Sequence, residues 1–247
     1  MTTLFQIPFE FDRQAVLEAI ERQTSRCGKG YVCVVDGNVL ATANKDPQYR
    51  EMLSGACVNI CDGSSIALLG GIIHRTQYAS FTGPELLVEC LSSTRFRSFF
   101  LGSSEAVLQS LKTKLSELDS AINNMQFMPL PYCSVEGFDY QTIGQAINRD
   151  QPDLVWVSLG APKQEFFIQR LLPHVDKGIF IGIGAALDFY SGLQTHRRAP
   201  AWLRKLHMEW AYRAVKEPRI AKRAWRYLLA LPGMIMNEFV KGTELSH

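Results

Sequence analysis

The stretch Ala56–Gly71, which reads ACVNICDGSSIALLGG, decides the fold of this chain. Its first half is a short apolar run typical of a buried parallel strand, and the run stops at Asp62-Gly63. In open α/β sheets ligands bind at the carboxyl ends of the strands, because the loops that follow the strands supply the chemistry. Asp62 is therefore a candidate functional residue. The alternative is that Asp62 only caps a helix over Ser64–Gly70, as Asp often does.

Length and composition indicate a globular cytoplasmic protein. The chain has 247 residues, of which 47% are hydrophobic and 20% are charged, so it can bury a large α/β core. Met1–Asp12 has no basic residue before its first acid and no long apolar run, so we expect neither a secretory signal nor a transit peptide. The apolar stretches near Ile179–Leu187 and Tyr227–Met236 are too short and too interrupted to cross a bilayer.

The cysteines indicate a reducing compartment. None of them forms a C-x-x-C pair, which argues against a zinc knuckle or a redox dithiol. We expect small buried hydrophobic residues at these positions. They are Cys27, Cys33, Cys57, Cys61, Cys90 and Cys133.

The charge is distributed unevenly. The segment Gln194–Ala230 contains ten Lys or Arg and two Glu, a net charge of +8, which leaves about −6 for the rest of a chain whose total is +2. We expect helices over Ala201–Lys216 and Ile220–Leu229, separated at Glu217-Pro218. Three of the four tryptophans share this segment. Solvated basic faces are common, but the mixture of cations and indoles favours binding at an anionic interface.

Strands and helices alternate before this segment. The expected strands are Leu4–Phe9, Tyr31–Val35, the run before Asp62, Ser98–Leu101, an edge strand Phe127–Val135, Asp153–Ser158 and Gly178–Ile183. The expected helices are Asp12–Arg22, Leu40–Leu53 with a break at Pro47, Ser64–Gly70, Gly83–Ser92, Glu105–Leu118, Gly137–Arg149 and one that ends at Leu172. This alternation predicts an α/β fold with a parallel sheet and helices on both faces.

Two further turns at strand ends carry groups that suit a ligand. Gly102–Ser104 is rich in backbone amides and opens a helix, so it suits a phosphate, although a well-capped helix explains it equally. In Gly160–Glu165, Pro162 precedes Lys163, Gln164 and Glu165, which places polar side chains beside unpaired helix amides. Gly184–Asp188 is expected to turn off the end of the following strand.

A dinucleotide-binding dehydrogenase is a poor match. Gly182-Ile183-Gly184 follows a strand, but Leu187 replaces the third glycine of G-x-G-x-x-G, and no acid ends a second strand about twenty residues later. The chain also lacks a P-loop, a G-x-S-x-G elbow and an H-E-x-x-H pair.

A series of short motifs runs through most of the chain. They are Asn38, Asp46-Pro47 with Arg50, Asp62-Gly63, Gly160–Glu165, Gly182–Gly184 with Asp188 and Gly192, Arg198-Ala199-Pro200, Glu209-Trp210, Tyr212-Arg213 and Glu217-Pro218. Each motif alone is weak, but their order and spacing together are highly specific. In this order they resemble the WecG/TagA/CpsF family of bacterial glycosyltransferases.

The resemblance implies transfer of a sugar, commonly N-acetylmannosamine, from its UDP conjugate to an undecaprenyl-diphosphate-linked sugar at the inner face of the cytoplasmic membrane. It also implies inversion at the anomeric carbon, a Rossmann-like core, no metal or other cofactor, and a C-terminal appendage that closes over the site and touches the membrane. The residues agree on the metal, because the sequence has no D-x-D pair. Arginines of the appendage then become the natural partners of the diphosphates.

The resemblance also assigns roles by position. Asp62 matches the proposed general base, Asn38 the Asn of a T-x-N motif, and Gln164 the polar residue of a G-x-P-K-Q-E turn. Arg213 and Arg223 match two basic positions of the appendage. The other expected substrate contacts are Gly63, Gly160, Lys163, Asp188, Arg198 and Arg219.

Three positions depart from the family pattern. Asp36 stands where Thr is usual, and Ser80 stands where an Arg is often found. Ile220 replaces a third Arg, with Arg219 beside it as a substitute. These changes bear on the identity of the donor and acceptor more than on the reaction type.

The sequence therefore predicts a catalytic core over residues 1–193 and a basic helical appendage over residues 194–247 that associates peripherally with an anionic membrane. Two rivals stay open: a non-catalytic nucleotide-sugar-binding or membrane-docking module, and a nucleic-acid-binding protein. The acidic body and the Trp residues among the cations argue against nucleic acid. Association with a second copy of the chain also stays open.

Overall fold

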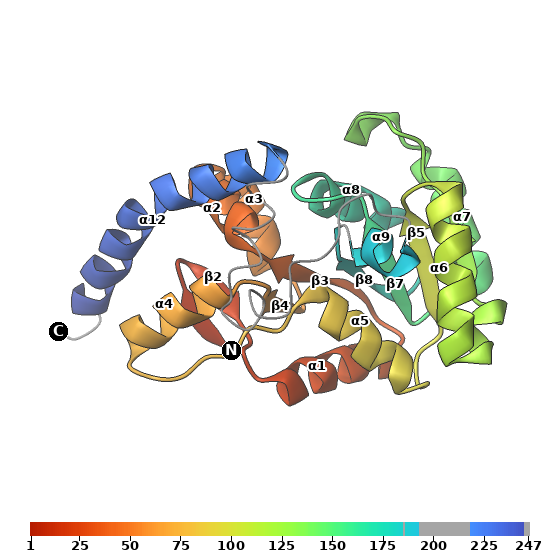
Figure 1. The fold of residues 1–247 in the computed structure, drawn as a ribbon, viewed down its shortest axis with the longest axis horizontal. Helices are drawn as coiled ribbons and strands as arrows, with labels where there is room; N and C mark the ends of the chain where they lie inside the picture. Colours follow the sequence, from red (N-terminus) through yellow and green to blue (C-terminus); the bar gives the residue numbers. More distant parts are fainter. Residues whose placement is uncertain (185, 193–217, 245–247) are drawn as a thin grey trace.

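The fold is that of a computed structural model, which describes residues 1–184, 186–192 and 218–244. Its centre is a parallel six-stranded sheet with the strand order β4-β3-β8-β7-β5-β6 (Figure 1). The strands are β3 (Lys29–Val35), β4 (Val58–Cys61), β5 (Ser98–Gly102), β6 (Gln126–Met128), β7 (Leu154–Ser158) and β8 (Gly178–Gly182). The predicted parallel α/β sheet is confirmed.

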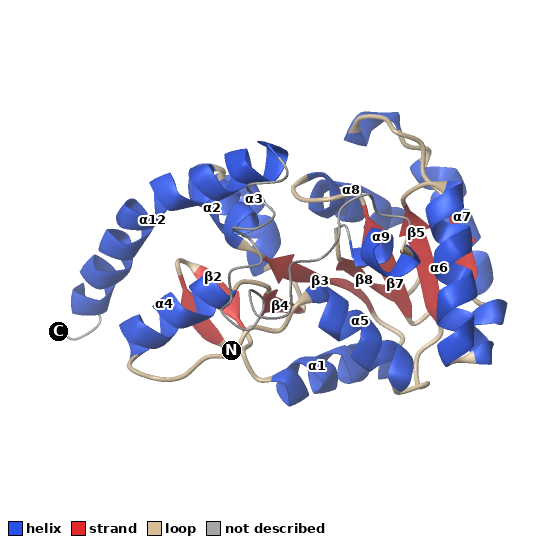
Figure 2. Ribbon diagram, in the orientation of Figure 1, coloured by secondary structure: helices blue, strands red, loops and turns tan. Residues whose placement is uncertain are grey.

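Helices cover both faces of this sheet (Figure 2). One face packs against α2 (Gly37–Lys45), α3 (Pro47–Ser54), α7 (Tyr140–Asp150) and α8 (Lys163–Leu171). The other face packs against α1 (Arg13–Ser25), α5 (Gly83–Ser92), α6 (Glu105–Leu118) and α9 (Ala186–Ser191). The layers are those of a Rossmann-like fold.

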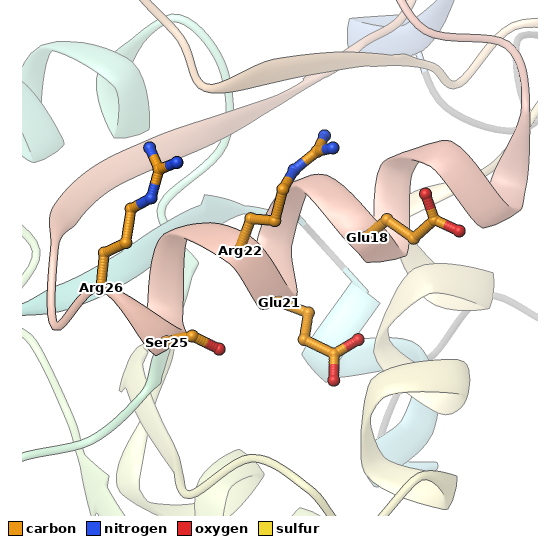
Figure 3. Close-up of a pocket in the computed structure, with 5 residues that line it drawn as sticks. All are labelled: Glu18, Glu21, Arg22, Ser25 and Arg26. Carbon is orange, nitrogen blue, oxygen red and sulfur yellow. The ribbon is translucent and has the colours of Figure 1, made fainter.

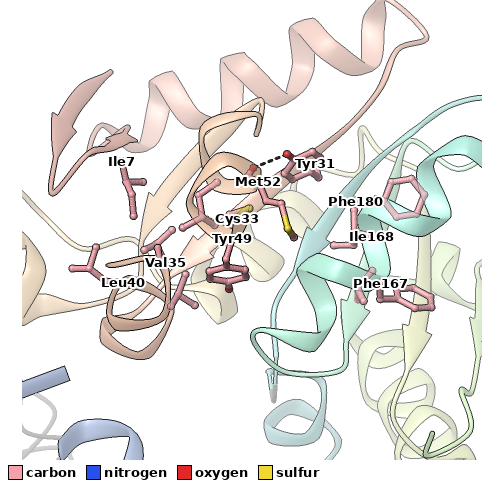
Figure 4. Close-up of a cluster of buried hydrophobic side chains, with 14 of the residues drawn as sticks. Ile7, Tyr31, Cys33, Val35, Leu40, Tyr49, Met52, Phe167, Ile168 and Phe180 are labelled. Carbon is pink, nitrogen blue, oxygen red and sulfur yellow. Dashed lines mark hydrogen bonds between the residues drawn. The ribbon is translucent and has the colours of Figure 1, made fainter. Parts of the chain in front are cut away.

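The strand residues divide between two hydrophobic clusters, one on each face. Along β3, Tyr31, Cys33 and Val35 join the first cluster, whereas Val32 and Val34 join the second. This follows from the period of two in a strand. Because both faces are covered, the strands read as continuous apolar runs, which is why the sequence locates them well. Figure 4 shows part of the first cluster, between α3 and α8.

The chain begins with a hairpin and not with the single predicted strand Leu4–Phe9. β1 (Thr2–Leu4) and β2 (Ile7–Phe9) pair antiparallel. Phe5 and Gln6 form the turn with φ values of 53° and 64°, in the left-handed region that non-glycine residues rarely adopt. Apolar alternation cannot reveal such a turn.

Other predicted elements have different bounds. The edge strand β6 ends at Met128 and not at Val135, because Pro129 and Pro131 cannot donate to a ladder. The turn after β8 contains the short helix α9. The remaining elements are α4 (Ser64–His74), η1 (Ser120–Asn124), η2 (Val135–Gly137) and η3 (Leu172–His174).

The cysteines are less uniform than predicted. Cys33, Cys61 and Cys90 are buried, but Cys27 is exposed and Cys57 and Cys133 are partly exposed, so the expectation that all six are buried is wrong. Cys27 follows the end of α1, in the turn that leads into β3, which explains its exposure.

The C-terminal helix α12 (Pro218–Glu244) is longer than the predicted Ile220–Leu229 and continues through Pro232. It packs on α2, and Glu238 Oε2 accepts a hydrogen bond of 2.9 Å from the Phe5 backbone N–H of the N-terminal hairpin. The predicted helix Ala201–Lys216 and the predicted boundary at residue 193 lie outside the described residues. Within the described ranges, no helix combines the length and the apolar character that a membrane span requires.

Candidate active site

The candidate site lies where neighbouring strands end. All strands of the central sheet are parallel, so their carboxyl ends share one edge. The strands β4, β3, β8 and β7 are consecutive neighbours in this sheet. Asp62, Asp36, Gly184 and Gly160 follow them at this edge. The sheet thus brings together segments more than a hundred residues apart in the sequence.

Asp62 lies directly after β4. Its backbone N–H donates to the Val35 carbonyl over 3.0 Å, which ties the turn to the end of β3. The N-cap of α4 is Gly63, one residue later, and a Cβ there would lie 3.1 Å from Ile66. Asp62 therefore does not occupy the N-cap position that the capping alternative gave it, and its side chain is partly exposed at the sheet edge.

Asp36 and Asn38 lie after β3. The Asp36 carboxylate accepts from the Val39 N–H over 2.8 Å and caps α2. Thr also caps helices well, so the departure from the family pattern at this position preserves the local structure. Asn38 lies in the first turn of α2 and is buried. Among the described residues its carboxamide makes no hydrogen bond, which leaves it able to bind a ligand.

Gln164 is the centre of the turns after β7 and β8. Its side chain is 3% exposed, and Oε1 accepts from the backbone N–H of Gly160 over 3.2 Å and of Gly184 over 3.0 Å. A Cβ at Gly182 would lie 2.7 Å from Gln164 Nε2, so this glycine makes room for the carboxamide. The predicted site residues Gly160 and Gln164 do come together, and the carboxamide of Gln164 holds both turns.

Gly160 and Gly184 expose the backbone of these two turns, because neither residue has a side chain. Their φ values are +77° and +55°, in the region that favours glycine. Among the residues that the structure describes, no atom lies within 4 Å of where a Cβ at either position would stand. No described side chain therefore covers the backbone of either turn at these glycines, while their amides already donate to Gln164.

Glu165 lies next to Gln164 and is buried. Gln164 Nε2 donates to Glu165 Oε1 over 2.9 Å. The pKa of Glu165 is raised to about 7, chiefly by burial and in smaller part by the Asp36 carboxylate, against the lowering effect of the hydrogen bond from Gln164. Figure 4 shows Tyr49 near α8 at this face of the core. The sequence placed Glu165 in the first turn of α8 but gave no sign of its burial or of Tyr49.

Asp188 joins the turn after β5 to α9. Ser103 Oγ donates to Asp188 Oδ1 over 2.7 Å, and Ser103 has a φ of +62°. Nearby, Ser158 Oγ donates to the Gly184 carbonyl over 2.6 Å. The predicted site residue Asp188 is thus brought to the Gly102–Ser104 turn, which the sequence alone had marked as a phosphate candidate.

Lys163 has partners away from these turns. Its ammonium group donates to the Cys133 carbonyl and lies 5.0 Å from the ring centre of Phe138 and 5.5 Å from that of Tyr132. These contacts brace the segment before α7. A contact with a diphosphate, which the sequence predicted, would compete with them.

The predicted arginines lie mostly beyond the described residues. Arg198 and Arg213 fall outside them, and Arg219 is described only as part of the backbone of α12. Arg223 is exposed on α12. The described residues contain no group of His, Cys, Asp and Glu that would hold a metal ion.

Tyr227 of α12 packs beside the candidate site, a contact that sequence reasoning missed. It is buried, and its ring packs on Gly37. A Cβ added at Gly37 would lie only 2.8 Å from the nearest atoms of the Tyr227 ring. Its hydroxyl is 3.5 Å from Ser65 Oγ at the start of α4. Burial raises the pKa of Tyr227, and the Asp36 carboxylate contributes. Tyr227 thus bridges the turns that carry Asn38 and Asp62.

A shallow depression on α1 is not the site. It is lined by Glu18, Glu21, Arg22, Ser25 and Arg26 (Figure 3). Arg26 closes α1 just before β3 begins, so the depression lies toward the amino ends of the strands. The described strand-end residues Asp62, Gly160 and Gly184 lie at the opposite edge.

A sequence profile described as "Glycosyl transferase WecG/TagA/CpsF family" matches residues 2–244. The chain belongs to this family. The predicted resemblance is confirmed, and with it the class of glycosyltransferases. The match includes the strand-end turns described above and α12.

Three similar proteins share the name N-acetylglucosaminyldiphosphoundecaprenol N-acetyl-beta-D-mannosaminyltransferase. The protein from Bacillus subtilis (strain 168) is 27% identical over 215 residues, which cover 83% of this chain and 80% of the relative. The protein from Bacillus spizizenii is 26% identical, covering 77% of this chain and 71% of the relative. The protein from Staphylococcus aureus (strain MW2) is 22% identical, covering 84% and 82%.

Proposed function

We propose that this glycosyltransferase moves N-acetylmannosamine, or a related hexose, from a UDP-sugar to a sugar carried on undecaprenyl diphosphate. The observation that supports this most directly is that Asp62, Asn38 and the turns at Gly160 and Gly184 all follow neighbouring strands at one sheet edge. The names of the relatives provide the sugar and the lipid.

Asp62 serves as general base in the proposed reaction. The acceptor hydroxyl attacks the anomeric carbon and gives its proton to the Asp62 carboxylate. As the new carbon–oxygen bond forms, the bond from the anomeric carbon to the UDP oxygen breaks, and UDP leaves with the electron pair. Attack opposite to the leaving group inverts the anomeric carbon, as in an inverting glycosidase with the acceptor hydroxyl in the place of water.

The departing diphosphate needs positive charge, and the two glycine turns do not provide it. Gln164 already accepts from the amides of Gly160 and Gly184. Arginines are suitable hydrogen-bond donors to the diphosphate, because they stay charged and each guanidinium group can bind two phosphate oxygens at once. Arg223 on α12 is one such residue, and Arg198, Arg213 and Arg219 are the others that the sequence predicts. In this proposal these cations replace a metal ion.

The proposed acceptor is a lipid, so the enzyme works at a membrane surface. α12 exposes Lys222, Arg223 and Arg226 beside Trp225, a combination suited to anionic headgroups. We therefore propose peripheral association with the inner face of the cytoplasmic membrane. Association with a second copy stays a prediction.

The experiment that tests this function offers the protein a panel of UDP-sugars with a short polyprenyl-diphosphate-linked N-acetylglucosamine. The expected result is one product whose mass has increased by one N-acetylhexosamine, with release of UDP. Transfer from a different UDP-sugar would correct the proposed identity of the donor and leave the proposed reaction type unchanged. No transfer from any donor, with UDP-sugar still bound, would favour the non-catalytic module.

A further inference from the structure

The helix α4 is apolar on all sides although one of its faces is exposed. Ile66, Ala67 and Gly70 are buried against the body of the protein, whereas Leu68 and Ile72 are 65% and 64% exposed. Leu68 and Ile72 are four residues apart and share one face. No charged residue occurs between Ser64 and Ile73. A helix that is apolar all round is normally covered, so this outer face suits an apolar partner.

Exposed hydrophobic side chains concentrate on α4 and α12. Six of the nine large ones in the described residues lie on these two helices, and the other three are scattered. The six are Leu68, Ile72, Trp225, Leu228, Leu229 and Met236. Single exposed hydrophobic residues need no explanation, but a concentration on two neighbouring elements does.

The two helices are held beside each other by the N-terminal hairpin and by Tyr227. A Cβ at Gly70 would lie 2.6 Å from Leu4 Cδ2, so α4 packs closely on the hairpin. Glu238 of α12 accepts from Phe5 of the same hairpin, and Tyr227 of α12 reaches Ser65 of α4. Figure 1 shows α4 next to β2, with α12 above them.

The positive charges on the same two helices indicate which kind of partner this apolar surface would bind. Lys222, Arg223 and Arg226 are exposed on α12, and Arg75 is exposed at the end of α4. Cations around an apolar strip complement an anionic lipid surface, where the hydrocarbon lies just below the phosphates.

We propose that the outer face of α4 inserts into the interface of an anionic bilayer next to α12, so that Asp62 stands at the level of the lipid headgroups. This rests on the proposed function, because the group that Asp62 would meet there is the hydroxyl of the sugar on a lipid-linked acceptor, whose diphosphate lies at the headgroup level. α4 begins two residues after Asp62. Ile72 lies eight residues along the helix from Ser64, which is about 12 Å. Contact through α4 therefore fixes the reaction centre relative to the membrane, which a tether on α12 alone would not do.

The test compares the full-length double variant Leu68→Gln/Ile72→Gln with the control Val88→Gln, which changes an exposed apolar residue on α5. Both are measured for co-sedimentation with phosphatidylglycerol–phosphatidylcholine vesicles. We expect the double variant to partition about 10-fold or more weakly, and the control to equal the wild type. Thermal unfolding of both variants should match that of the wild type, because the changed side chains are exposed.

A second measurement separates this proposal from the proposed function. The double variant should transfer sugar to a short water-soluble acceptor at the wild-type rate, and about 10-fold more slowly to an undecaprenyl acceptor in vesicles. Unchanged vesicle partition would overturn the role of α4 whether or not transfer is observed. If the wild type sediments as a dimer and the double variant as a monomer, with vesicle partition unchanged, a second copy covers this face and the proposal is overturned.

Discussion

The ring of Tyr227 packs directly against the backbone of Gly37, with ring atoms 2.8 Å from the place where a Cβ would stand. Gly37 opens α2 between the capping residue Asp36 and the predicted sugar ligand Asn38. Tyr227 comes from α12, almost two hundred residues later. This contact makes the position of the C-terminal helix depend on the turn after β3, and the turn depend on the helix.

Gly37→Ala should therefore loosen α12. Alanine normally favours a helix, but here its methyl group would displace the ring, at a cost of about 1–3 kcal/mol. Urea unfolding and hydrogen exchange of the α12 amides measure the effect. In the double variant Gly37→Ala/Tyr227→Ala the clash is removed, so the two changes should be strongly non-additive. Additive changes in the free energy of unfolding would show that the contact between Gly37 and Tyr227 does not contribute to stability.

Gln164→Leu should disturb the turns at Gly160 and Gly184, where we expect the UDP-sugar to bind. The amides of Gly160 and Gly184 would lose their acceptor, and each buried unpaired group costs about 1–3 kcal/mol. We expect a KM for the UDP-sugar at least about 10-fold higher, together with lower stability. Gln109→Leu, at an exposed position of α6, is the matched control. A wild-type KM in Gln164→Leu would mean that these turns do not shape the donor site.

Asp62→Asn should preserve the fold and remove the base. Asn has nearly the same shape, and the backbone bond from residue 62 to Val35 remains. A general base typically contributes about 10²–10⁴ in rate, so turnover should fall at least about 100-fold. Asp12→Asn serves as the control, since Asn also caps the start of α1. Turnover of Asp62→Asn within a few-fold of wild type would leave Asp62 without a catalytic role.

Activity should survive EDTA. The sequence has no D-x-D pair, and the described residues hold no cluster of metal ligands. Cations of the chain would then balance the diphosphate. Initial rates with EDTA and with added Mg²⁺ should agree within about twofold. Abolition by EDTA and rescue by Mg²⁺ would contradict the proposed site.

The sequence predicted the sheet and the strand-end residues because both depend on local patterns. β7 is buried along its whole length and reads as LVWVS, and the polar turns follow each such run. The contacts of Tyr227 and Glu165 were not predictable in this way. Tyr227 looks like any aromatic residue of an amphipathic helix, and Glu165 looks like a favourable first-turn acid. Burial by distant segments gives both their roles, and no local pattern encodes that burial.

The last prediction concerns the pH dependence of stability through Glu165. Burial raises its pKa from 4.5 to about 7 in the folded protein. Between these values the folded state keeps a proton that the unfolded state has lost, so the free energy of unfolding falls as the pH rises. The total loss is roughly 3 kcal/mol, because one pKa unit corresponds to about 1.4 kcal/mol. Asp36, Cys33 and Tyr49 interact electrostatically with this carboxyl group, and Asp36 acts to raise its pKa.

Glu165→Gln removes this titration and keeps an oxygen that accepts from Gln164. Its free energy of unfolding should therefore depend much less on pH between 5 and 8, and at pH 8 it should exceed that of the wild type. Glu85→Gln is the control of opposite sign. Hydrogen bonds from the Thr82 amide and hydroxyl and from Arg13 lower the pKa of Glu85, despite the raising effect of burial. The ionised Glu85 carboxylate therefore stabilises the folded protein at neutral pH, and this stabilisation disappears as the pH falls and Glu85 becomes protonated. Urea unfolding at several pH values measures both variants, and a Glu165→Gln curve parallel to the wild type would show that Glu165 stays ionised in the folded protein.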